Sequence, residues 1–144
     1  MTADARLATI LQGLRGAGGR VTPARRAIVT ALVSAEGHVT ADDIVARVQA
    51  ASPEVHRSTV YRTLDALEHL GVVDHVHLGH GRSVYHLADD PHQHLVCDVC
   101  GSVAEMPDAF VEGFARQVES AFGFRVRMHH FAILGRCGAC APRA

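Results

Sequence analysis

The chain has 144 residues, of which 48% are hydrophobic and 5% aromatic, and it contains no tryptophan. This length suits one domain or two small ones, and the apolar content is that of a globular protein with an aliphatic core. The formal net charge is −1 and all 14 basic residues are arginine, which argues against a nonspecific polyanion coat but allows a local DNA-reading face. Since the sequence has no apolar signal run and no stretch of membrane-spanning length, we expect a cytoplasmic protein.

The first half of the chain predicts four helices. Apolar residues recur at helical spacing in segments that begin near residues 5, 23, 41 and 58. Thr22, followed by a proline, is a typical N-cap, and Thr40 with Asp43 resembles a capping box in which aspartate replaces glutamate. Gly71 fits the C-terminal cap of the fourth helix, which covers roughly residues 58–70.

A β-hairpin is predicted next, from residues 72–78 and 83–87 with a turn between them. His75 and His77 alternate with apolar residues, the period of a half-buried strand. Helices that end in a hairpin outline a winged helix-turn-helix, whose recognition helix would be the fourth. The outward residues of that helix are Arg57, Ser58, Tyr61, Arg62 and Asp65. Such an arginine can bond a guanine edge, although an ordinary solvated helix face is the alternative.

The polar break at residues 89–91 predicts a hinge. Beyond it, the patterns predict short strands at residues 94–97 and 102–106, a helix from residue 107 that ends at Gly123, and a long strand over residues 124–134. A unit of about fifty residues buries little apolar surface by itself, so we expect a bound metal ion and a dimer interface to stabilise it. The sequence thus predicts an α+β protein. Its expected parts are a winged-helix DNA-binding domain (residues 1–88), the hinge (89–91), and a small α/β dimerisation and metal-binding domain (92–144).

All four cysteines lie in two Cys-x-x-Cys pairs, Cys97 with Cys100 and Cys137 with Cys140. Two thiolate pairs match a tetrahedral zinc site, in which each pair supplies one edge. We therefore interpret the cysteines as a structural zinc site. The alternative is a redox-active pair, as in a thiol oxidoreductase or an oxidant-sensing switch, but such a pair is typically found at a helix start that follows a strand.

The sequence contains 11 histidines, and two pairs have i, i+2 spacing: His75 with His77, and His92 with His94. Side chains at this spacing project from one face of a strand. Together with Glu105, such imidazoles suit zinc, nickel, cobalt or iron(II). Because neither a His-Glu-x-x-His motif nor an evident nucleophile is present, we expect a binding protein and not a metallohydrolase or other enzyme. An adaptor that binds another protein through the zinc unit is a further alternative.

Several linked motifs resemble the ferric uptake regulator (Fur) family. They are Thr-Pro-x-Arg at residues 22–25, Ser-Thr-Val-Tyr-Arg-Thr-Leu at 58–64, His-x-His-Leu-Val-Cys-x-x-Cys-Gly at 92–101, and the closing Cys-x-x-Cys. The resemblance implies a homodimeric, metal-dependent transcriptional repressor that binds a palindromic DNA operator with the metal as corepressor. It implies no membrane and no small-molecule substrate.

The resemblance also implies residue roles. The structural zinc ligands would be the four cysteines. A regulatory Ni²⁺, Zn²⁺ or Fe²⁺ would bind at residues that match the family's sensing site, His38, His86, His92, His94 and Glu105. The residues that match or adjoin the DNA-reading motifs are Arg20, Arg57, Ser58, Thr59, Tyr61 and Arg62.

Two departures from the family pattern bear on the metal. A third family site matches Pro91, Gln93, Glu112 and His129, and its proline and glutamine predict that it is degraded here. The segments around His75, His77 and His130 resemble a nickel site of the nickel-responsive (Nur) branch, so nickel is ranked ahead of zinc and iron. His86 differs from the cysteine of zinc sensors and from the aspartate of peroxide sensors, although a peroxide-sensing regulator of the same fold remains the alternative.

Overall fold

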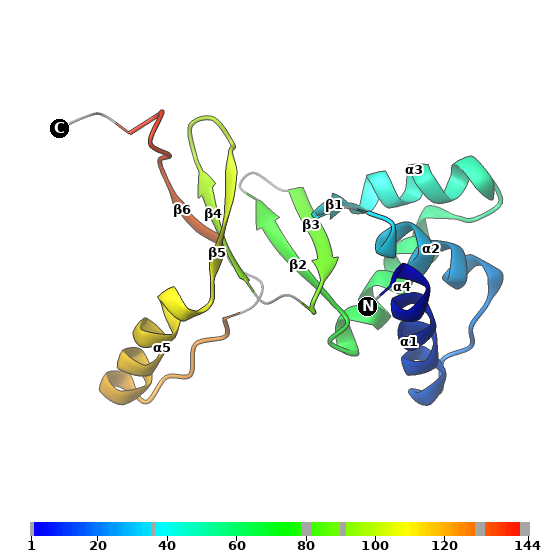
Figure 1. The fold of residues 1–144 in the computed structure, drawn as a ribbon, viewed down its shortest axis with the longest axis horizontal. Coiled ribbons are helices and arrows are strands. Elements are labelled where there is room, and N and C mark those ends of the chain that lie inside the picture. Colours follow the sequence, from blue (N-terminus) through cyan, green and yellow to red (C-terminus); the bar gives the residue numbers. More distant parts are fainter. Residues whose placement is uncertain (1, 36, 79–81, 90–91, 129–131, 142–144) are drawn as a thin grey trace. The chain divides into compact units, whose positions relative to one another are not determined.

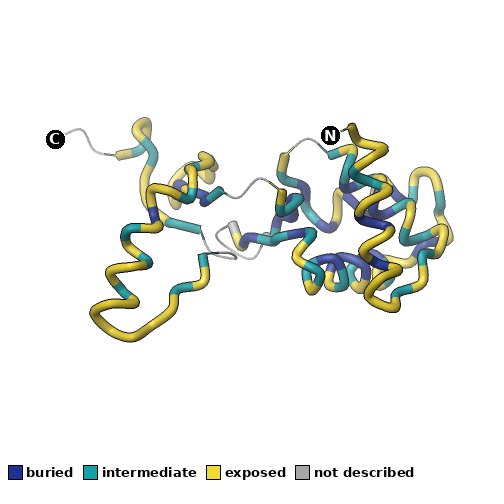
Figure 2. Tube along the Cα trace, turned by 60° about the horizontal axis from the view of Figure 1, so that its bottom comes forward, coloured by how far each residue is buried: buried dark blue, intermediate teal, exposed yellow. Residues whose placement is uncertain are grey.

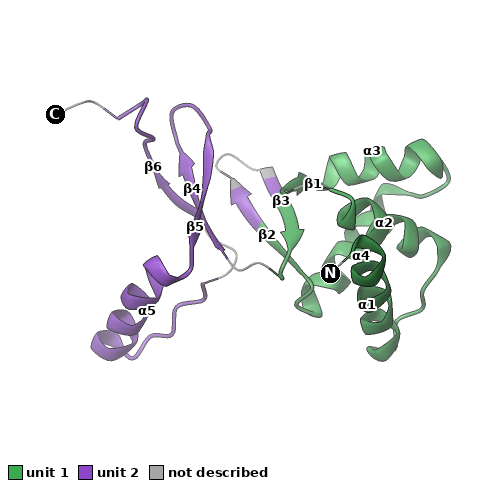
Figure 3. Ribbon diagram, viewed as in Figure 1, with its two compact units in different colours: residues 1–75, 84–89 green, residues 76–83, 90–144 purple. Residues whose placement is uncertain are grey.

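The computed structural model describes residues 2–35, 37–78, 82–89, 92–128 and 132–141. The chain divides into two compact units, residues 1–75 with 84–89 and residues 76–83 with 90–144 (Figure 3). Within the described ranges, none of the helices is both long enough and apolar enough to cross a membrane. The elements labelled in Figure 1 are α1 (Ala3–Gly16), α2 (Pro23–Val33), β1 (Val39–Thr40), α3 (Ala41–Ala51), α4 (Arg57–His69), β2 (Val73–Leu78), β3 (Arg82–Leu87), β4 (His92–Cys97), β5 (Val103–Pro107), α5 (Ala109–Phe122) and β6 (Ala132–Gly135).

Threonine caps define the starts of the first three helices. Thr2 Oγ1 accepts a hydrogen bond from the Ala5 amide at 3.3 Å, and Thr22 Oγ1 accepts one from the Arg25 amide at 3.2 Å. Thr40 and Asp43 form a reciprocal capping box at 3.1 and 3.2 Å. These bonds satisfy backbone donors that have no partner inside a helix. The caps predicted at residues 22 and 40 are therefore confirmed.

The first unit is a winged helix around an aliphatic core (Figure 2). The inward stripes of α2, α3 and α4 supply side chains with no exposed surface, among them Ile28, Val29, Ile44, Val60, Leu64 and Leu67. The hairpin strands β2 and β3 are joined by β1 in the order β1-β3-β2. The pairing of Val39 with Tyr85 was not predicted, because a strand of two residues shows no alternating pattern. The predicted turn at residues 79–82 falls largely on residues 79–81, which lie outside the described residues.

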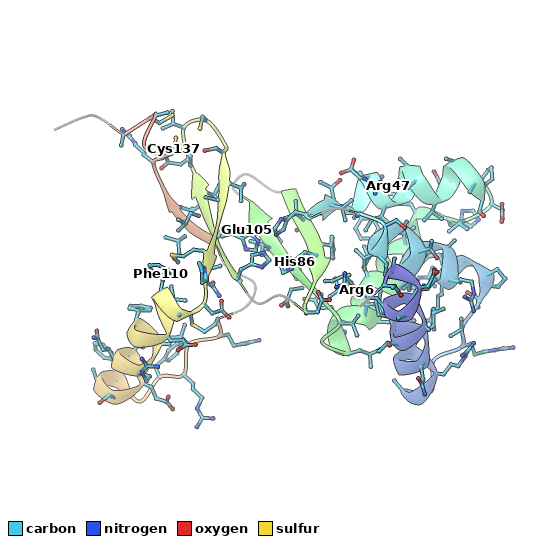
Figure 4. All side chains as sticks on the ribbon, viewed as in Figure 1. Arg6, Arg47, His86, Glu105, Phe110 and Cys137 are labelled. Atoms are coloured by element: carbon cyan, nitrogen blue, oxygen red, sulfur yellow. The ribbon has the colours of Figure 1, made fainter. Side chains whose placement is uncertain are left out.

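An ion pair ties the end of this unit to its first helix. Arg6 of α1, labelled in Figure 4, lies with Nη2 2.6 Å from Asp89 Oδ2. Asp89 is the first residue of the predicted hinge, and residues 90 and 91 lie outside the described residues. The ion pair links α1 to the residue at which the first unit ends.

The second unit contains a sheet in the order β5-β4-β6 and the helix α5. Strand β4 pairs antiparallel with β5 and parallel with β6. The predicted long strand over residues 124–134 is wrong, because residues 124–128 have no regular structure and β6 covers Ala132–Gly135; residues 129–131 lie outside the described residues. A strand needs a backbone partner, and among the described residues the ladder between β4 and β6 begins at the pairing of His94 with Ala132. Gly123 ends α5 with φ of 61°, as its predicted role as a helix stop requires.

The helix α5 leaves most of its apolar side chains exposed (Figure 2). Phe110, Phe114 and Phe122 are 74%, 57% and 79% exposed, and Val111 is the one buried residue of the helix. Their helical spacing therefore creates an apolar stripe that this single chain leaves open.

Candidate functional sites

The four cysteines converge at one end of the second unit, where Figure 4 labels Cys137. All four Sγ atoms lie within 4.8 Å of one another, and Cys100 Sγ is 3.7 Å from Cys137 Sγ. A disulfide has a bond length of about 2.05 Å, so these sulfurs are unbonded thiols. A tetrahedron with Zn–S bonds of about 2.3 Å has an edge of about 3.8 Å, which is close to the observed separation. The cluster thus fits a tetrahedral zinc ion.

The backbone around the cysteines favours thiolates. Amide groups of Cys137, Cys100 and Val99 lower the pKa of Cys97 to about 6, and the amides of Ala139 and Cys140 lower the pKa of Cys137. In contrast, hydrogen bonds with the sulfurs of Cys137 and Cys100 raise the pKa of Cys140 to about 12. Without a cation, thiolates this close together repel one another, which opposes deprotonation of the cluster. A divalent metal would remove this conflict, as it does in zinc knuckles.

His92 and His94 lie two residues apart on β4, with ring centroids 4.7 Å from each other. His94 is only 1% exposed, and it pairs across the sheet with Glu105 of β5. The Glu105 carboxylate reaches toward the other ring, with Oε1 3.8 Å from His92 Nε2. Strand pairing therefore gathers two imidazoles and one carboxylate within the second unit, a donor set that suits a divalent metal of intermediate softness.

His38 and His86 form a second histidine pair, within the first unit. His38 precedes β1 and His86 lies in β3, and their ring centroids are 4.9 Å apart. His86 is buried, and its Nδ1 lies 3.0 Å from the Leu87 carbonyl oxygen. A histidine that donates Nδ1–H to a carbonyl presents Nε2 for coordination. The pairing of β1 with β3 brings together residues that are 48 positions apart and that the family resemblance had assigned to one site.

The histidines of the expected nickel site have other partners. His75 Nδ1 lies 2.7 Å from Glu68 Oε1 of α4, and His77 Nδ1 lies 2.9 Å from the Ser83 hydroxyl. The ring of His75 also lies 5.7 Å from that of Tyr85, whose pKa is raised by burial and then by the carboxylates of Asp65 and Glu68. His130 lies outside the described residues. The structure therefore leaves this site as a prediction.

Gln93, which matches a residue of the family's third site, forms two hydrogen bonds within the second unit. Gln93 is 2% exposed, and its Nε2 donates to Asp108 Oδ1 at 2.8 Å and to the Met128 carbonyl at 2.7 Å. Glu112, another matching residue, has its Oε2 atom 3.6 Å from Arg116 Nη1. Pro91 and His129 lie outside the described residues. Asp108 and Met128 were not identified from the sequence, because nothing local to them signals a partner on β4.

The helix α4 presents the side chains expected to read DNA. Arg57, Ser58 and Arg62 are exposed, whereas Thr59 and Tyr61 are half-buried. Arg62 folds back on its own helix, with Nη2 3.1 Å from Ser58 Oγ. Arg20 is exposed in the segment that precedes α2. The structure thus leaves the expected residues of α4 at or near the surface, and the opposite face of the helix fills the core.

The fold and the thiolate cluster define a class of α+β protein in which a winged helix is joined to a unit with a four-cysteine metal site. Comparison with known proteins then identifies the family. The sequence model of the "Ferric uptake regulator family" matches residues 16–134. The chain belongs to this family of metal-responsive transcriptional regulators.

Three relatives illustrate the match. The ferric uptake regulation protein of Bacillus subtilis is 35% identical over 140 residues, which cover 94% of each chain. A structure of the ferric uptake regulator from Pseudomonas aeruginosa with manganese is 34% identical, with a TM-score of 0.69 over 87% of this chain and 95% of that one. A structure of a zinc uptake regulator complexed with zinc and DNA is 28% identical, with a TM-score of 0.67 over 96% of this chain and 95% of that one. The α+β fold predicted from the sequence is confirmed.

Proposed function

We propose that this protein is a metal-dependent transcriptional repressor that binds a palindromic operator as a homodimer, with the metal as corepressor. The observation that carries the proposal is the presence, in a member of this family, of a histidine pair in each compact unit: His38 with His86, and His92 with His94. A single ion that takes ligands from both pairs would restrict the motion of one unit against the other.

The proposed DNA contacts lie on α4 and ahead of α2. Arg57, Ser58, Thr59, Tyr61 and Arg62 would contact bases and phosphates in the major groove, and Arg20 would enter the minor groove. The support is the exposure of these arginines on a winged helix, together with the DNA complex of the related zinc uptake regulator. Since the whole chain is not basic, specific contacts would contribute more to binding than net charge does.

The proposed regulatory ligands are His38, His86, His92, His94 and Glu105. In a two-unit protein, the DNA-competent arrangement is one of many until an ion fixes it, and the apparent operator affinity falls with the fraction of competent molecules. The metal ion would therefore strengthen DNA binding without itself contacting the DNA. The structural zinc at Cys97, Cys100, Cys137 and Cys140 would instead hold the second unit folded.

We rank nickel ahead of zinc and iron as the sensed metal. The proposed regulatory ligands are four imidazoles and one carboxylate with no thiolate, and this set accepts all three ions. The ranking depends on the resemblance of the segments around His75, His77 and His130 to the nickel-responsive branch. Oxidant sensing by the same fold predicts instead that peroxide abolishes DNA binding by the iron(II) form.

Dimerisation through the second unit is supported by its exposed apolar side chains. Phe110, Phe114 and Phe122 of α5 and Leu134 of β6 are all more than half exposed. An exposed apolar set of this size on a small unit is typical of an interface between subunits. A homodimer would present two recognition helices to two half-sites of a palindrome, about one helical turn of DNA apart.

The test starts from zinc-loaded protein and a random pool of DNA duplexes, from which repeated selection yields a binding sequence. The affinity for this duplex is then measured at buffered free concentrations of Zn²⁺, Ni²⁺, Fe²⁺ and Mn²⁺. We expect a metal-dependent rise in affinity on the order of tenfold or more, with nickel effective at the lowest free concentration relative to its cellular range.

Binding that is independent of every metal would contradict the corepressor mechanism. Failure to enrich any duplex would contradict DNA binding itself. Loss of DNA binding after peroxide treatment of the iron(II) form, with the zinc form unaffected, would favour the oxidant sensor. A response to zinc at lower free concentrations than nickel would remove nickel from first place.

A further inference from the structure

The first residue of α4 is held in place by a residue of another helix. Arg57 donates from Nη2 to Asp42 Oδ1 of α3 and to the Tyr61 hydroxyl, the latter at 3.2 Å. The guanidinium carbon also lies 5.5 Å from the centroid of the Tyr61 ring. The hydrogen bond that Arg57 donates to Tyr61 and the negative charge of Asp42 both raise the pKa of Arg57 above its ordinary value. Three interactions from two helices thus fix the direction of one side chain.

The carboxylate that holds Arg57 sits on a rigid support. Asp42 lies in the first turn of α3, where the helix dipole favours a negative charge. The adjacent capping box between Thr40 and Asp43 closes the same turn. Because α3 and α4 pack against each other in the first unit (Figure 1), the position of Asp42 relative to α4 is set by the core and not by flexible side chains.

The other arginine on this face of α4 is arranged differently. Arg62 bonds to the carbonyl and hydroxyl of Ser58, at 3.3 and 3.1 Å, and both acceptors belong to its own helix. These acceptors are neutral, whereas Arg57 has a carboxylate partner on α3. The two arginines would therefore differ in role, since only Arg57 has its direction set by tertiary structure.

The contact between Asp42 and Arg57 has little value for folding. The two side chains are 67% and 58% exposed, and exposed ion pairs contribute little to the free energy of unfolding. Its consequence is orientation: an arginine that is already held loses less rotamer freedom when it binds. The planar guanidinium already supplies the two donors that a guanine edge requires in a fixed fork, so the direction of the side chain is what remains to be set.

From this geometry, and on the basis of the DNA-binding function proposed above, we infer that Asp42 is a positioning residue for base reading. It holds Arg57 so that the guanidinium meets the O6 and N7 atoms of a guanine in the major groove. The guanine takes one hydrogen from Nη1 and one from Nη2, while Asp42 keeps the other Nη2 hydrogen. Only the hydroxyl of Tyr61 has to leave. Asp42 thereby contributes to sequence specificity without touching DNA.

The test measures specificity and not affinity alone. The probe is a fluorescein-labelled duplex enriched from a random pool by the zinc-loaded wild-type protein. Each guanine is replaced in turn by 7-deazaguanine, which lacks the N7 acceptor, and the ratio of the two dissociation constants is the discrimination at that position. The guanine at which Arg57→Ala abolishes this discrimination is the one that Arg57 reads.

At that guanine, we expect Asp42→Asn and Asp42→Ala to lower the discrimination at least about threefold, because a bidentate contact discriminates by roughly 5- to 150-fold when the arginine is held. Discrimination at the other guanines stays unchanged. The matched control is Glu54→Gln, which removes one negative charge from an exposed position in the turn before α4 and should leave every ratio unchanged. Thermal melting confirms that each variant is folded.

Wild-type discrimination in both Asp42 variants would overturn this inference and leave the proposed function intact. The inference would also be overturned, with the proposed function intact, if Arg57→Ala abolished the discrimination at none of the guanines. If the wild-type protein enriches no duplex, the proposed function and this inference fail together. An equal loss of discrimination in Glu54→Gln would assign the effect to net charge and would also overturn the inference.

Discussion

Gln93 of β4 donates its side-chain amide to Asp108, which directly precedes α5, across 2.8 Å. The same nitrogen donates to the Met128 carbonyl at 2.7 Å, so one buried side chain joins the sheet to both ends of the α5 segment. In the family pattern this region matches a metal site, and here a neutral amide supplies two donors where a cation would supply charge. These two hydrogen bonds therefore hold the residues before and after α5 against β4.

The first prediction concerns this link. Gln93→Ala should lower the free energy of unfolding of the zinc-loaded protein by about 1–3 kcal/mol, because it leaves two partly buried acceptors unsatisfied. Gln93→Glu should cost more at neutral pH, since it replaces the donating amide by a carboxylate beside the acceptors Asp108 and Met128. Urea denaturation measures both. Equal stability of Gln93→Glu and wild type at pH 7 would contradict the assigned hydrogen bonds.

A second prediction concerns the thiolate cluster. Removal of zinc by a chelator, or the change Cys97→Ala, should unfold the second unit, because structural zinc supplies on the order of 10 kcal/mol to small metal-binding folds. Zinc content and far-ultraviolet circular dichroism measure the loss. Ser102→Ala is the matched control, since its hydroxyl lies 3.2 Å from Cys100 Sγ but is not a thiolate ligand. A metal-free protein with unchanged ellipticity would contradict a structural role.

The third prediction separates sensing from folding. His92→Ala should leave the zinc content of the cysteine cluster and the melting temperature unchanged. It should lower the affinity for the regulatory metal at least about tenfold, because loss of a residue that merely hydrogen-bonds to a metal ligand already has an effect of this size. Metal-dependent DNA binding would weaken in parallel. His69→Ala, at the exposed C-terminal end of α4, is the control histidine. A metal titration of His92→Ala that matches the wild type would exclude His92 as a ligand.

The fourth prediction tests the nickel ranking. The double change His75→Ala with His77→Ala should shift the nickel titration of DNA binding to higher free metal while the zinc titration stays in place. Both metals must be compared, because His75 also contacts Glu68 of the proposed recognition helix and its loss could change DNA binding with any metal. If both titrations shift equally, the histidines act on the helix, and nickel loses its support.

The fifth prediction addresses the exposed stripe of α5. Phe110→Glu should weaken self-association by at least about 2 kcal/mol, since burial of one phenylalanine contributes this much and a homodimer carries two. Sedimentation equilibrium measures the dimer constant. Gln117→Glu adds the same charge at an exposed polar position of α5 and should leave the constant unchanged. A dimer equally strong in Phe110→Glu would place the interface elsewhere.

Most of the local structure could be predicted because its causes are local. The caps at Thr22 and Thr40 depend on hydrogen bonds across three residues, and the stop at Gly123 depends on a single positive φ. The shared face of His92 and His94 follows from the period of a strand. The strand expected over residues 124–134 failed for the opposite reason, since its apolar pattern could not reveal that only its last part has a partner strand.

The sequence by itself thus determined the chemistry that this protein has available: four thiolates in two pairs, histidines on strand faces, and arginines on a helix with a buried opposite face. Tertiary structure decided how these groups are brought together. Cys100 reaches Cys137 across 37 positions because β6 lies parallel to β4, and Arg57 reaches Asp42 because α3 packs against α4. Gln93 finds Met128 across 35 positions in the same way. Such contacts depend on how the cores pack, and no local period in the sequence encodes them.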